Sequence, residues 1–200
     1  MAAYDYPVSD LFLPASCKVW IAPNVLVVTS PLTQQSTVRD LVGDKWRMQL
    51  DFDWVARGDA VDDQASREAF WNSVGLANTV RLWHFARPVP RGTMRGSPTL
   101  GAAAAKGATS LSISTTAGAT LYAGDMIGVA SQWLQVTANA SADGAGAMAV
   151  SVAPKLRAAV ASGSAVAWSR PTVEFRCVAP IEIPYSYGPS PGFTVDLVER

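Results

Sequence analysis

The sequence predicts a mainly β protein with one helix, in which a small β-rich domain is inserted into a host β domain. Three observations predict this fold class. Hydrophobic residues make up 49% of the 200 residues and charged residues only 16%, a composition that excludes a disordered chain. Residues 46–54 alternate strictly between large apolar and polar side chains, the pattern of a half-buried antiparallel strand. The composition also changes abruptly near Thr93 and changes back near Thr172.

This change in composition places the domain boundaries. Residues 93–171 carry five basic and two acidic side chains, with no Glu and 21 alanines. The remainder carries eleven basic and fourteen acidic side chains, so the net charge of zero is a cancellation between a basic insert and an acidic host. Proline-rich stretches at 87–92 and 169–171 flank the insert. We expect a discontinuous host domain of residues 1–92 and 172–200 and an inserted domain of residues 93–171.

Several short segments of the host are rich in β-branched and aromatic residues, which favour strands. The expected strands are 17–22, 25–30, 46–54, 79–85, 172–178 and 193–199. One helix is expected over about 61–74, because Asp62 and Asp63 suit a helix N-terminus and Gly75 ends it. The helix is expected to cover the sheet that contains residues 46–54. Its apolar stripe at helical spacing consists of Val61, Ala65, Ala69, Phe70 and Val74.

The insert is expected to consist of short strands joined by tight turns. These strands are 110–115, 125–130, 133–138, 147–153 and 165–168. Residues 142–146, with Asp143, Gly144 and Gly146, suit a hairpin turn because Asp and Gly tolerate positive φ. The alanine run 102–105 lies between glycines and is a marginal helix former. Five short strands in about 80 residues indicate a small barrel or sandwich.

A search for catalytic patterns identifies no enzyme active site. His84, the only histidine, alternates onto the face of Val80 and Leu82 and is interpreted as a packed strand residue. The sequence has no G-x-S-x-G elbow, Walker A pattern or G-x-G-x-x-G. Asp51 and Asp53 lie on the same face of a strand and could form a catalytic carboxylate pair. We interpret both as solvent-exposed residues of that face. We expect no catalytic, cofactor-binding or metal-binding residue and no cofactor.

Acidic residues near the expected helix are candidates for a hydrolase pair and for a calcium loop. Asp62 and Asp63 are interpreted as a helix N-terminus, and together with Asp59 they lack the spaced pattern of a calcium loop. One His and two Cys leave few ligands for zinc. With no export signal visible at the start, we expect Cys17 and Cys177 to be free, buried thiols. No apolar run approaches the length of a membrane span, so no membrane insertion is expected.

The balanced charge argues against nucleic-acid recognition, which needs a basic excess. Four arginines nevertheless lie close together among aromatic residues: Arg81, Arg87, Arg91 and Arg95. We interpret this strip as a polar edge that faces a protein partner.

The order of landmarks along nearly the full chain resembles the distal tail or minor tail proteins of long-tailed, siphovirus-type bacteriophages. In the host these landmarks are Ser30-Pro31-Leu32-Thr33, Trp46-Arg47, Phe70-Trp71, Gly75-Leu76-Ala77-Asn78 and Arg91-Gly92. In the insert they are Leu121-Tyr122-Ala123-Gly124-Asp125, Asp143-Gly144-Ala145-Gly146 and Pro154-Lys155-Leu156-Arg157. The chain closes with Val173-Glu174-Phe175-Arg176 and Val195-Asp196-Leu197-Val198-Glu199.

This resemblance implies a structural virion protein rather than an enzyme. It implies a β-sandwich-like domain that forms an oligomeric ring, most often a hexamer, beneath the tail tube, with a small β domain projecting outward. The ring would join the tube to the distal hub or fibre assembly of the tail tip or baseplate. The implied partners are further copies of the chain, the tail tube protein, the hub or tip proteins and the tape-measure protein. The implied location is the virion tail tip, after assembly in the bacterial host cytoplasm.

We expect the interface to involve strand 46–54, whose apolar face is core, the strip 81–91 and the end 193–200. The individual interface residues expected are Arg81, Trp83, Arg87, Arg91, Phe193 and Val195. A second hypothesis makes the insert a binding module for a host-surface receptor or glycan, through exposed aromatics such as Trp133 and Trp168. A third hypothesis is a tail-associated hydrolase that uses Asp or Glu pairs.

Overall fold

A computed structural model describes residues 1–200 except 10–11, 54–60 and 185–191, and except the side chains of residues 61–63. Trp54 and Asp59, and the side chains of Val61, Asp62 and Asp63, therefore lie outside the described residues. The described chain is mainly β with one helix, which confirms the predicted fold class.

The chain divides into two compact units. Unit 1 comprises Met1–Trp20, Trp46–Ala86 and Val173–Arg200, and unit 2 comprises Ile21–Lys45 and Arg87–Thr172. The predicted insert began at residue 93. In the structure residues 87–92 and 21–45 are grouped with it, because they contact its residues.

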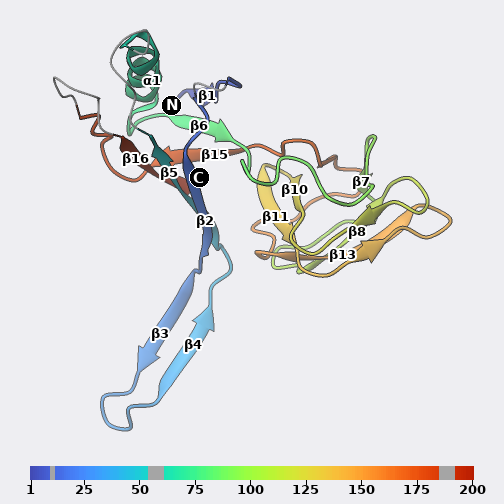
Figure 1. Cartoon of the computed structure of the whole chain (residues 1–200). Helices are drawn as coiled ribbons and strands as arrows, with labels where there is room; N and C mark the ends of the chain where they lie inside the picture. Colours follow the sequence, from blue (N-terminus) through green and yellow to red (C-terminus); the bar gives the residue numbers. More distant parts are fainter. Residues whose placement is uncertain (10–11, 54–60, 185–191) are drawn as a thin grey trace. The chain divides into compact units, whose positions relative to one another are not determined.

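A six-stranded sheet forms most of unit 1 (Figure 1). Its strands, in sheet order, are β1 (Ala3–Asp5), β6 (Thr79–Leu82), β15 (Val173–Cys177), β16 (Phe193–Glu199), β5 (Lys45–Phe52) and β2 (Ser16–Ala22). β1 is parallel to β6, whereas β15 is antiparallel to both β6 and β16, and β16 is antiparallel to β5. The sequence did not predict β1, which is only three residues long.

The alternation predicted for residues 46–54 is present in β5. Trp46, Met48, Leu50 and Phe52 are each at most 4% exposed, whereas Arg47 between them is exposed. β16 lies beside β5, so Phe193 faces Phe52 and their rings stack with centroids 4.7 Å apart. The apolar face of β5 is therefore core, as expected.

Helix α1 (Val61–Val74) packs on this apolar face. Trp71 is fully buried and its ring centroid lies 6.1 Å from that of Phe52. The predicted stripe was wrong at Ala65 and Ala69, which are exposed, and right at Val74, which is buried. The large indole, rather than the small alanines, decides which face of the helix turns toward the sheet, because it buries more apolar area.

Unit 2 contains a second six-stranded sheet that is nearly closed into a barrel. Its strands, in sheet order, are β14 (Val166–Ala167), β10 (Met126–Val129), β11 (Gln132–Val136), β13 (Ala147–Ala153), β8 (Ser110–Ser114) and β7 (Thr99–Leu100). Backbone hydrogen bonds from Val166 to Pro98 and from Leu100 to Ser164 link the two outer strands. A small ladder of β9 (Thr120–Leu121) and β12 (Ala140–Ser141) accompanies the barrel. The barrel-like character predicted for the insert is confirmed.

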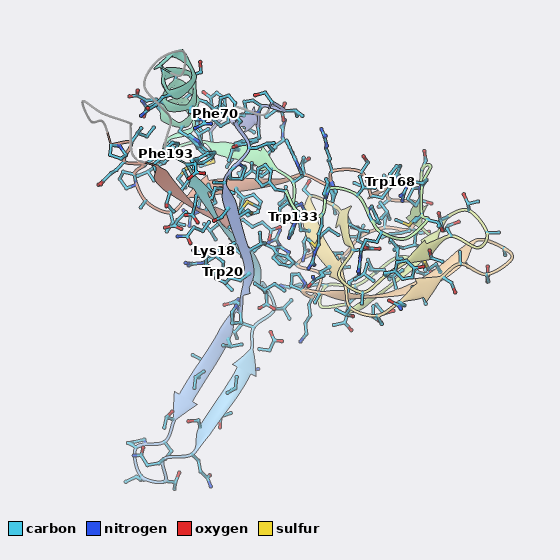
Figure 2. The ribbon with its side chains drawn as sticks, in the orientation of Figure 1. Lys18, Trp20, Phe70, Trp133, Trp168 and Phe193 are labelled. Carbon is cyan, nitrogen blue, oxygen red and sulfur yellow. The ribbon has the colours of Figure 1, made fainter. Side chains whose placement is uncertain are left out.

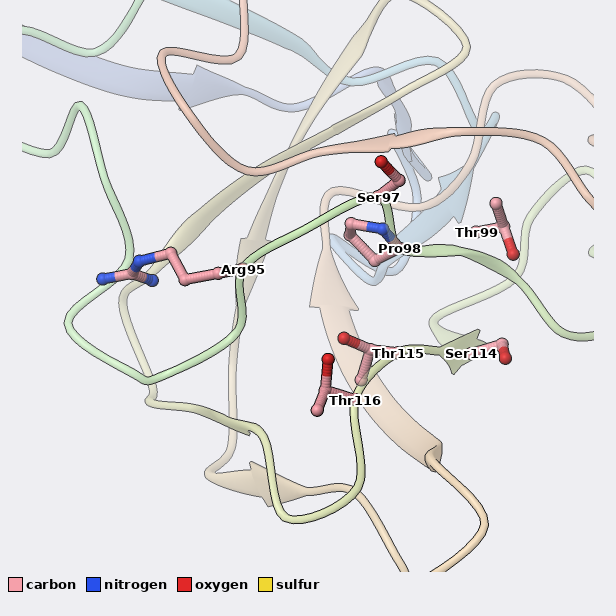
Figure 3. A pocket seen from close by; sticks show the side chains of 7 residues that line it. All are labelled: Arg95, Ser97, Pro98, Thr99, Ser114, Thr115 and Thr116. Atoms are coloured by element: carbon pink, nitrogen blue, oxygen red, sulfur yellow. The ribbon is translucent and has the colours of Figure 1, made fainter.

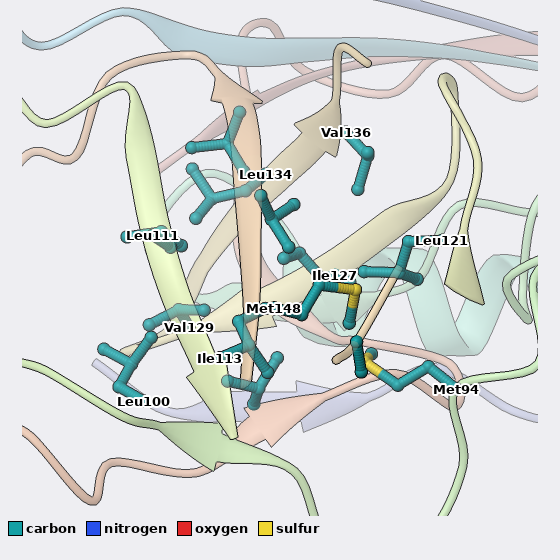
Figure 4. Close-up of a cluster of buried hydrophobic side chains, with 14 of the residues drawn as sticks. Met94, Leu100, Leu111, Ile113, Leu121, Ile127, Val129, Leu134, Val136 and Met148 are labelled. Carbon is teal, nitrogen blue, oxygen red and sulfur yellow. The ribbon is translucent and has the colours of Figure 1, made fainter. Parts of the chain in front are cut away.

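Aliphatic and methionine side chains fill the barrel, as Figure 4 shows. Residues of β8, β10 and β13, such as Ile113, Ile127 and Val150, are fully buried. The predicted turn at 142–146 is present, because the Asp143 carboxylate accepts the backbone N–H groups of Ala145 and Ala147 at 2.9 and 2.8 Å. The alanine run 102–105 is not helical, and Ala104 instead bridges to Val160.

The remaining strands form a separate two-stranded hairpin within unit 2 (Figure 1). β3 (Val25–Thr29) pairs antiparallel with β4 (Ser36–Asp40), and the loop between them spans residues 30–35. β3 was predicted from its apolar residues. β4 was not, because Val38 is its only apolar residue.

Candidate interaction surface

The strand β3 is formed almost entirely by large aliphatic residues. It has four of them in succession, Val25, Leu26, Val27 and Val28. A strand with one wet face alternates apolar and polar residues, whereas a continuous apolar run is typical of a strand covered on both faces. Yet all residues of β3 and β4 are exposed, so the described chain covers neither face.

The pairing register assigns these side chains to the two faces of the hairpin. Val27 lies opposite Val38, so this pair shares one face, to which Val25 also belongs. Leu26 and Val28 point to the opposite face. Val27, Val28 and Val38 are 55%, 56% and 63% exposed. Figure 2 shows side chains that extend from both sides of the hairpin.

The loop that joins the two strands has a defined shape. The backbone N–H of Ser30 donates to Gln35, and that of Gln34 donates back to Ser30, both at 2.9 Å. The hydroxyls of Thr29 and Ser36 lie 2.8 Å apart across the strand ends. These bonds present Leu32, 93% exposed, at the tip.

Polar contacts fix the base of the hairpin within unit 2. Lys155, which follows β13, pairs with the carboxylate of Asp40 at 2.5 Å. The hydrogen bond from Lys155 and another from the backbone N–H of Val42 lower the pKa of Asp40, and Asp40 raises the pKa of Lys155. The carboxylate of Asp44 accepts the backbone N–H of Asn24 at 2.7 Å. Polar contacts therefore hold the base of the hairpin in place, whereas its two strands are exposed.

Leaving this surface in water is unfavourable. Burying an exposed Val or Leu side chain completely is worth about 1.5–3 kcal/mol. A two-stranded hairpin alone is only marginally stable, and unpaired strand edges attract other strands. We name the side chains of β3 and β4, with Leu32, the hairpin surface. Its chemistry suits a protein partner that packs on both faces.

The predicted interface residues of unit 1 occupy different environments. Arg81 is partly exposed and pairs with Asp5 at 3.0 Å and with Glu174 at 3.9 Å. Trp83, Phe193 and Val195 are 8%, 7% and 1% exposed. These three side chains belong to the core of unit 1, so the interface that we propose below uses other residues.

Arg87 and Arg91 make contacts within unit 2. Arg87 donates from Nη1 to the carbonyl of Gly124 at 2.9 Å. Arg91 donates from Nη2 to the carbonyl of Ala123, and its Nε lies 3.4 Å from the Asp125 carboxylate. Asp125 was not predicted to have a role, although its side chain is only 2% exposed. The predicted basic strip thus includes residues that hold a turn of unit 2 in place.

The tryptophans of the glycan-binding hypothesis are not free aromatic platforms. Trp133 is fully buried and donates from Nε1 to the carbonyl of Pro171 at 2.6 Å, so its expected exposure was wrong. Trp168 is half-buried, and its Nε1 donates to the carbonyl of Gly96 at 2.8 Å. The guanidinium of Arg95 lies over the Trp168 ring, 4.9 Å from its centroid. Figure 2 labels both tryptophans.

The residues considered for catalysis, His84, Asp51 and Asp53, lie in unit 1. His84 is half-buried after β6. Asp51 accepts hydrogen bonds from Ser16 and Thr194 and forms an ion pair with Lys18 at 3.8 Å. Chiefly the Ser16 bond lowers the pKa of Asp51. Asp53, expected to share a face with Asp51, is exposed.

Neither a metal cluster nor a membrane-spanning helix is found in the described part of the chain. No three His, Cys, Asp or Glu side chains there are grouped as metal ligands. No helix there is both long enough and apolar enough to cross a membrane. Cys17 and Cys177 are free thiols, and burial raises the pKa of each to about 11.

Comparison with protein-family models and with curated proteins found no match to this chain. The hairpin surface is therefore identified from its own chemistry. The sequence contains one signal that points to it, the unbroken apolar run Val25–Val28 in a strand that no other part of the described chain covers.

Proposed function

We propose that this chain is a structural virion protein that assembles with copies of itself into a ring at the tail tip of a long-tailed phage. The ring, most often sixfold in the proteins that the sequence resembles, would join the tail tube to the distal hub or fibre assembly. The order of sequence landmarks supports the tail-tip assignment. The hairpin surface supports the self-assembly.

The observation that carries the proposal is that β3 is apolar on both faces and exposed on both faces. A twofold dimer uses one patch twice, so it covers one face of each hairpin. A head-to-tail contact that closes into a ring gives each subunit a neighbour on either side. Such a ring covers both faces of every hairpin, which is what the run Val25–Val28 requires.

Copies of the chain suit this surface in their charge as well. The hairpin carries one basic and one acidic strand residue, Arg39 and Asp40, and Asp40 is paired with Lys155. The full chain has a formal net charge of zero, so copies do not repel one another strongly. Apolar packing can therefore dominate the association.

The virion role is tested by locating the protein in phage particles. Mass spectrometry of purified virions is expected to detect the chain, and immunogold labelling is expected to mark one end of the tail. A phage whose gene for this chain is disrupted should accumulate particles or tails without a complete tip. Absence of the chain from purified virions would overturn the proposal.

A further inference from the structure

We infer that Leu32, at the tip of the hairpin surface, inserts into a pocket on unit 1 of a neighbouring copy of this chain. The inference rests on the proposed self-assembly, and it names the site on the neighbour that receives the hairpin. The pocket has a volume of about 160 Å³. It is lined by residues of unit 1 alone, namely Trp20, Arg47, Val178, Asp196 and Leu197, and we name it the sheet pocket.

The sheet pocket lies on the face of the six-stranded sheet that is turned away from the core of unit 1. Met48 of β5 and Leu197 of β16 lie opposite one another and are buried on the core face. Since successive side chains of a strand point to opposite faces, Arg47 and Asp196 point outward. Val178 shares that outer face, because its N–H donates to the Asp196 carbonyl at 2.9 Å. The pocket is therefore a hollow of the outer surface.

Apolar side chains frame this hollow on a face that is polar elsewhere. Along β2 and β5, Lys18 donates to the Gln49 side chain at 2.9 Å and lies 3.8 Å from the Asp51 carboxylate. At the pocket the pattern changes, since Trp20 and Val178 are 43% and 48% exposed. Figure 2 labels both Lys18 and Trp20 on β2. An exposed apolar hollow rimmed by polar groups is typical of a site for an apolar partner group.

The side chain of Leu32 matches the hollow in size and in presentation. No other large apolar side chain in the described ranges is as exposed as Leu32, at 93%. A cavity of about 150 Å³ holds a molecule of the size of benzene, so the sheet pocket has room for one leucine side chain. Pro31 restricts the backbone before Leu32, and the bonds within the loop 30–35 hold the tip in shape. Insertion of a tip that is already ordered costs little conformational entropy.

The polar groups around the tip and the pocket are also complementary. In the described part of the chain, the N–H and the carbonyl of Leu32 form no hydrogen bond. Nor does the Arg47 guanidinium or the Asp196 carboxylate have a hydrogen-bond or ion-pair partner among the described residues. In the complex the guanidinium can donate to the Leu32 carbonyl, and the carboxylate can accept the Leu32 N–H. Such charge-assisted bonds are stronger than bonds between neutral groups.

A larger cavity in unit 2 does not suit the tip. It has a volume of about 240 Å³, and Figure 3 shows the Arg95 side chain directed away from the other lining residues. Five of those residues carry hydroxyl groups: Ser97, Thr99, Ser114, Thr115 and Thr116. An apolar side chain in this cavity would take hydroxyls out of water without giving them a hydrogen-bond partner. The sheet pocket is therefore the site that we assign to Leu32.

The test uses two lysine variants of the full chain, Leu32→Lys in the tip and Val178→Lys in the pocket. Each should weaken association by roughly tenfold or more, measured by sedimentation velocity, because the apolar contact is lost. Both positions are exposed in the single chain, so the melting temperatures of the dissociated subunits should change little. Leu76→Lys, at a position of unit 1 that is 52% exposed and outside the pocket, is the matched control and should associate like the unmodified chain.

Mixing the two variants tests the contact directly, because the tip and the pocket are different surfaces. At a concentration at which each variant alone is a single subunit, an equimolar mixture should form a complex of two subunits. The unmodified tip of the Val178→Lys copy then occupies the unmodified pocket of the Leu32→Lys copy. The remaining tip and pocket each carry a lysine, so no further copy is added.

The outcomes separate this contact from self-assembly as such. Association of both variants equal to that of the unmodified chain would overturn the inference and leave the proposed self-assembly intact. A mixture of the two variants that forms no complex would also overturn it. A single-subunit mass for the unmodified chain at every concentration would instead overturn the proposed self-assembly, and this contact with it.

Discussion

The carboxylate of Asp125 accepts the backbone N–H of Arg91 at 3.0 Å, so the turn before β10 holds the segment that precedes the barrel. The same carboxylate accepts the backbone N–H groups of Tyr122 at 2.8 Å and Gly92 at 3.3 Å. Gly92 packs so closely on Thr120 that a Cβ would lie 2.0 Å from its carbonyl oxygen. One buried acid and one glycine thus position the start of unit 2.

Replacing Asp125 should destabilise unit 2. Asp125→Ala leaves three backbone N–H groups without their acceptor and should lower the free energy of unfolding by about 3 kcal/mol. Asp125→Asn keeps one acceptor oxygen and should cost less. Urea unfolding followed by Trp fluorescence measures both. Equal stability of Asp125→Ala and the unmodified chain would show that these bonds contribute nothing.

The pair formed by Lys155 and Asp40 predicts a specific titration. The hydrogen bond from Lys155 lowers the pKa of Asp40 below its ordinary value of 3.8. Because the folded-state pKa is lowered, the stabilisation is present above pH 3.8 and is lost as the pH falls through the folded-state value. Lys155→Gln should raise the pKa of Asp40, though not fully to 3.8, because the N–H of Val42 still donates. NMR titration of the Asp40 carboxyl carbon measures the change.

An Asp40 titration that is the same in Lys155→Gln as in the unmodified chain would contradict this prediction. It would show that the contact between the hairpin base and Lys155 does not exist in solution.

The two thiols predict a loss of stability at alkaline pH. Burial raises the pKa of Cys17 and Cys177 from 9.0 to about 11. Because their folded-state pKa values are raised, this contribution is intact below pH 9 and is lost as the pH rises from 9 toward 11. The urea concentration at the unfolding midpoint should therefore decrease as the pH rises from 9 to 11. Relative to its own midpoint at pH 8, the Cys177→Ala variant should show a smaller decrease. A parallel decline in the two proteins would show that Cys177 does not contribute.

The hairpin surface predicts a variant that alters assembly without altering the fold. Val27→Asp places a charge on a side chain that is already 55% exposed in the single chain, so the melting temperature of the dissociated subunit should change little. In an assembly the same carboxylate would be buried without a partner, and association should weaken at least a hundredfold. Sedimentation velocity over a concentration series measures the association.

Leu76→Asp is the matched control for the hairpin variant. Leu76 is 52% exposed and lies after α1 in unit 1, away from the hairpin in the sequence. The control should associate like the unmodified chain. Equal weakening by both substitutions would indicate a general effect of added charge rather than an interface at the hairpin.

Local patterns in the sequence were sufficient to predict most strands but not how they pair. The alternation around Met48 and Leu50 identifies β5, and Asp143 with Gly146 identifies a turn, because each signal lies within a few residues. β4 has a single apolar residue, Val38, and forms only because β3 pairs with it across a loop. Such non-local pairing leaves no periodic signal.

The hairpin surface could be predicted only in part, because the exposure of a strand also depends on non-local contacts. The apolar run Val25–Val28 is visible in the sequence, but a run of this kind also describes an ordinary buried strand. Only the structure shows that β3 is exposed on both faces. Conversely, Trp83 and Phe193 were expected at an interface because they lie in the strip 81–91 and in the end 193–200. Their side chains are buried in the core of unit 1.

The most direct test of self-assembly is the mass of the purified full chain in solution, measured by light scattering after size-exclusion chromatography across the micromolar range. We predict one discrete oligomer that contains more than two subunits of 21.1 kDa each. The Val27→Asp variant should dissociate into smaller species, whereas Leu76→Asp should remain assembled. A mass of 21.1 kDa at every concentration, equal in all three proteins, would contradict the proposed ring.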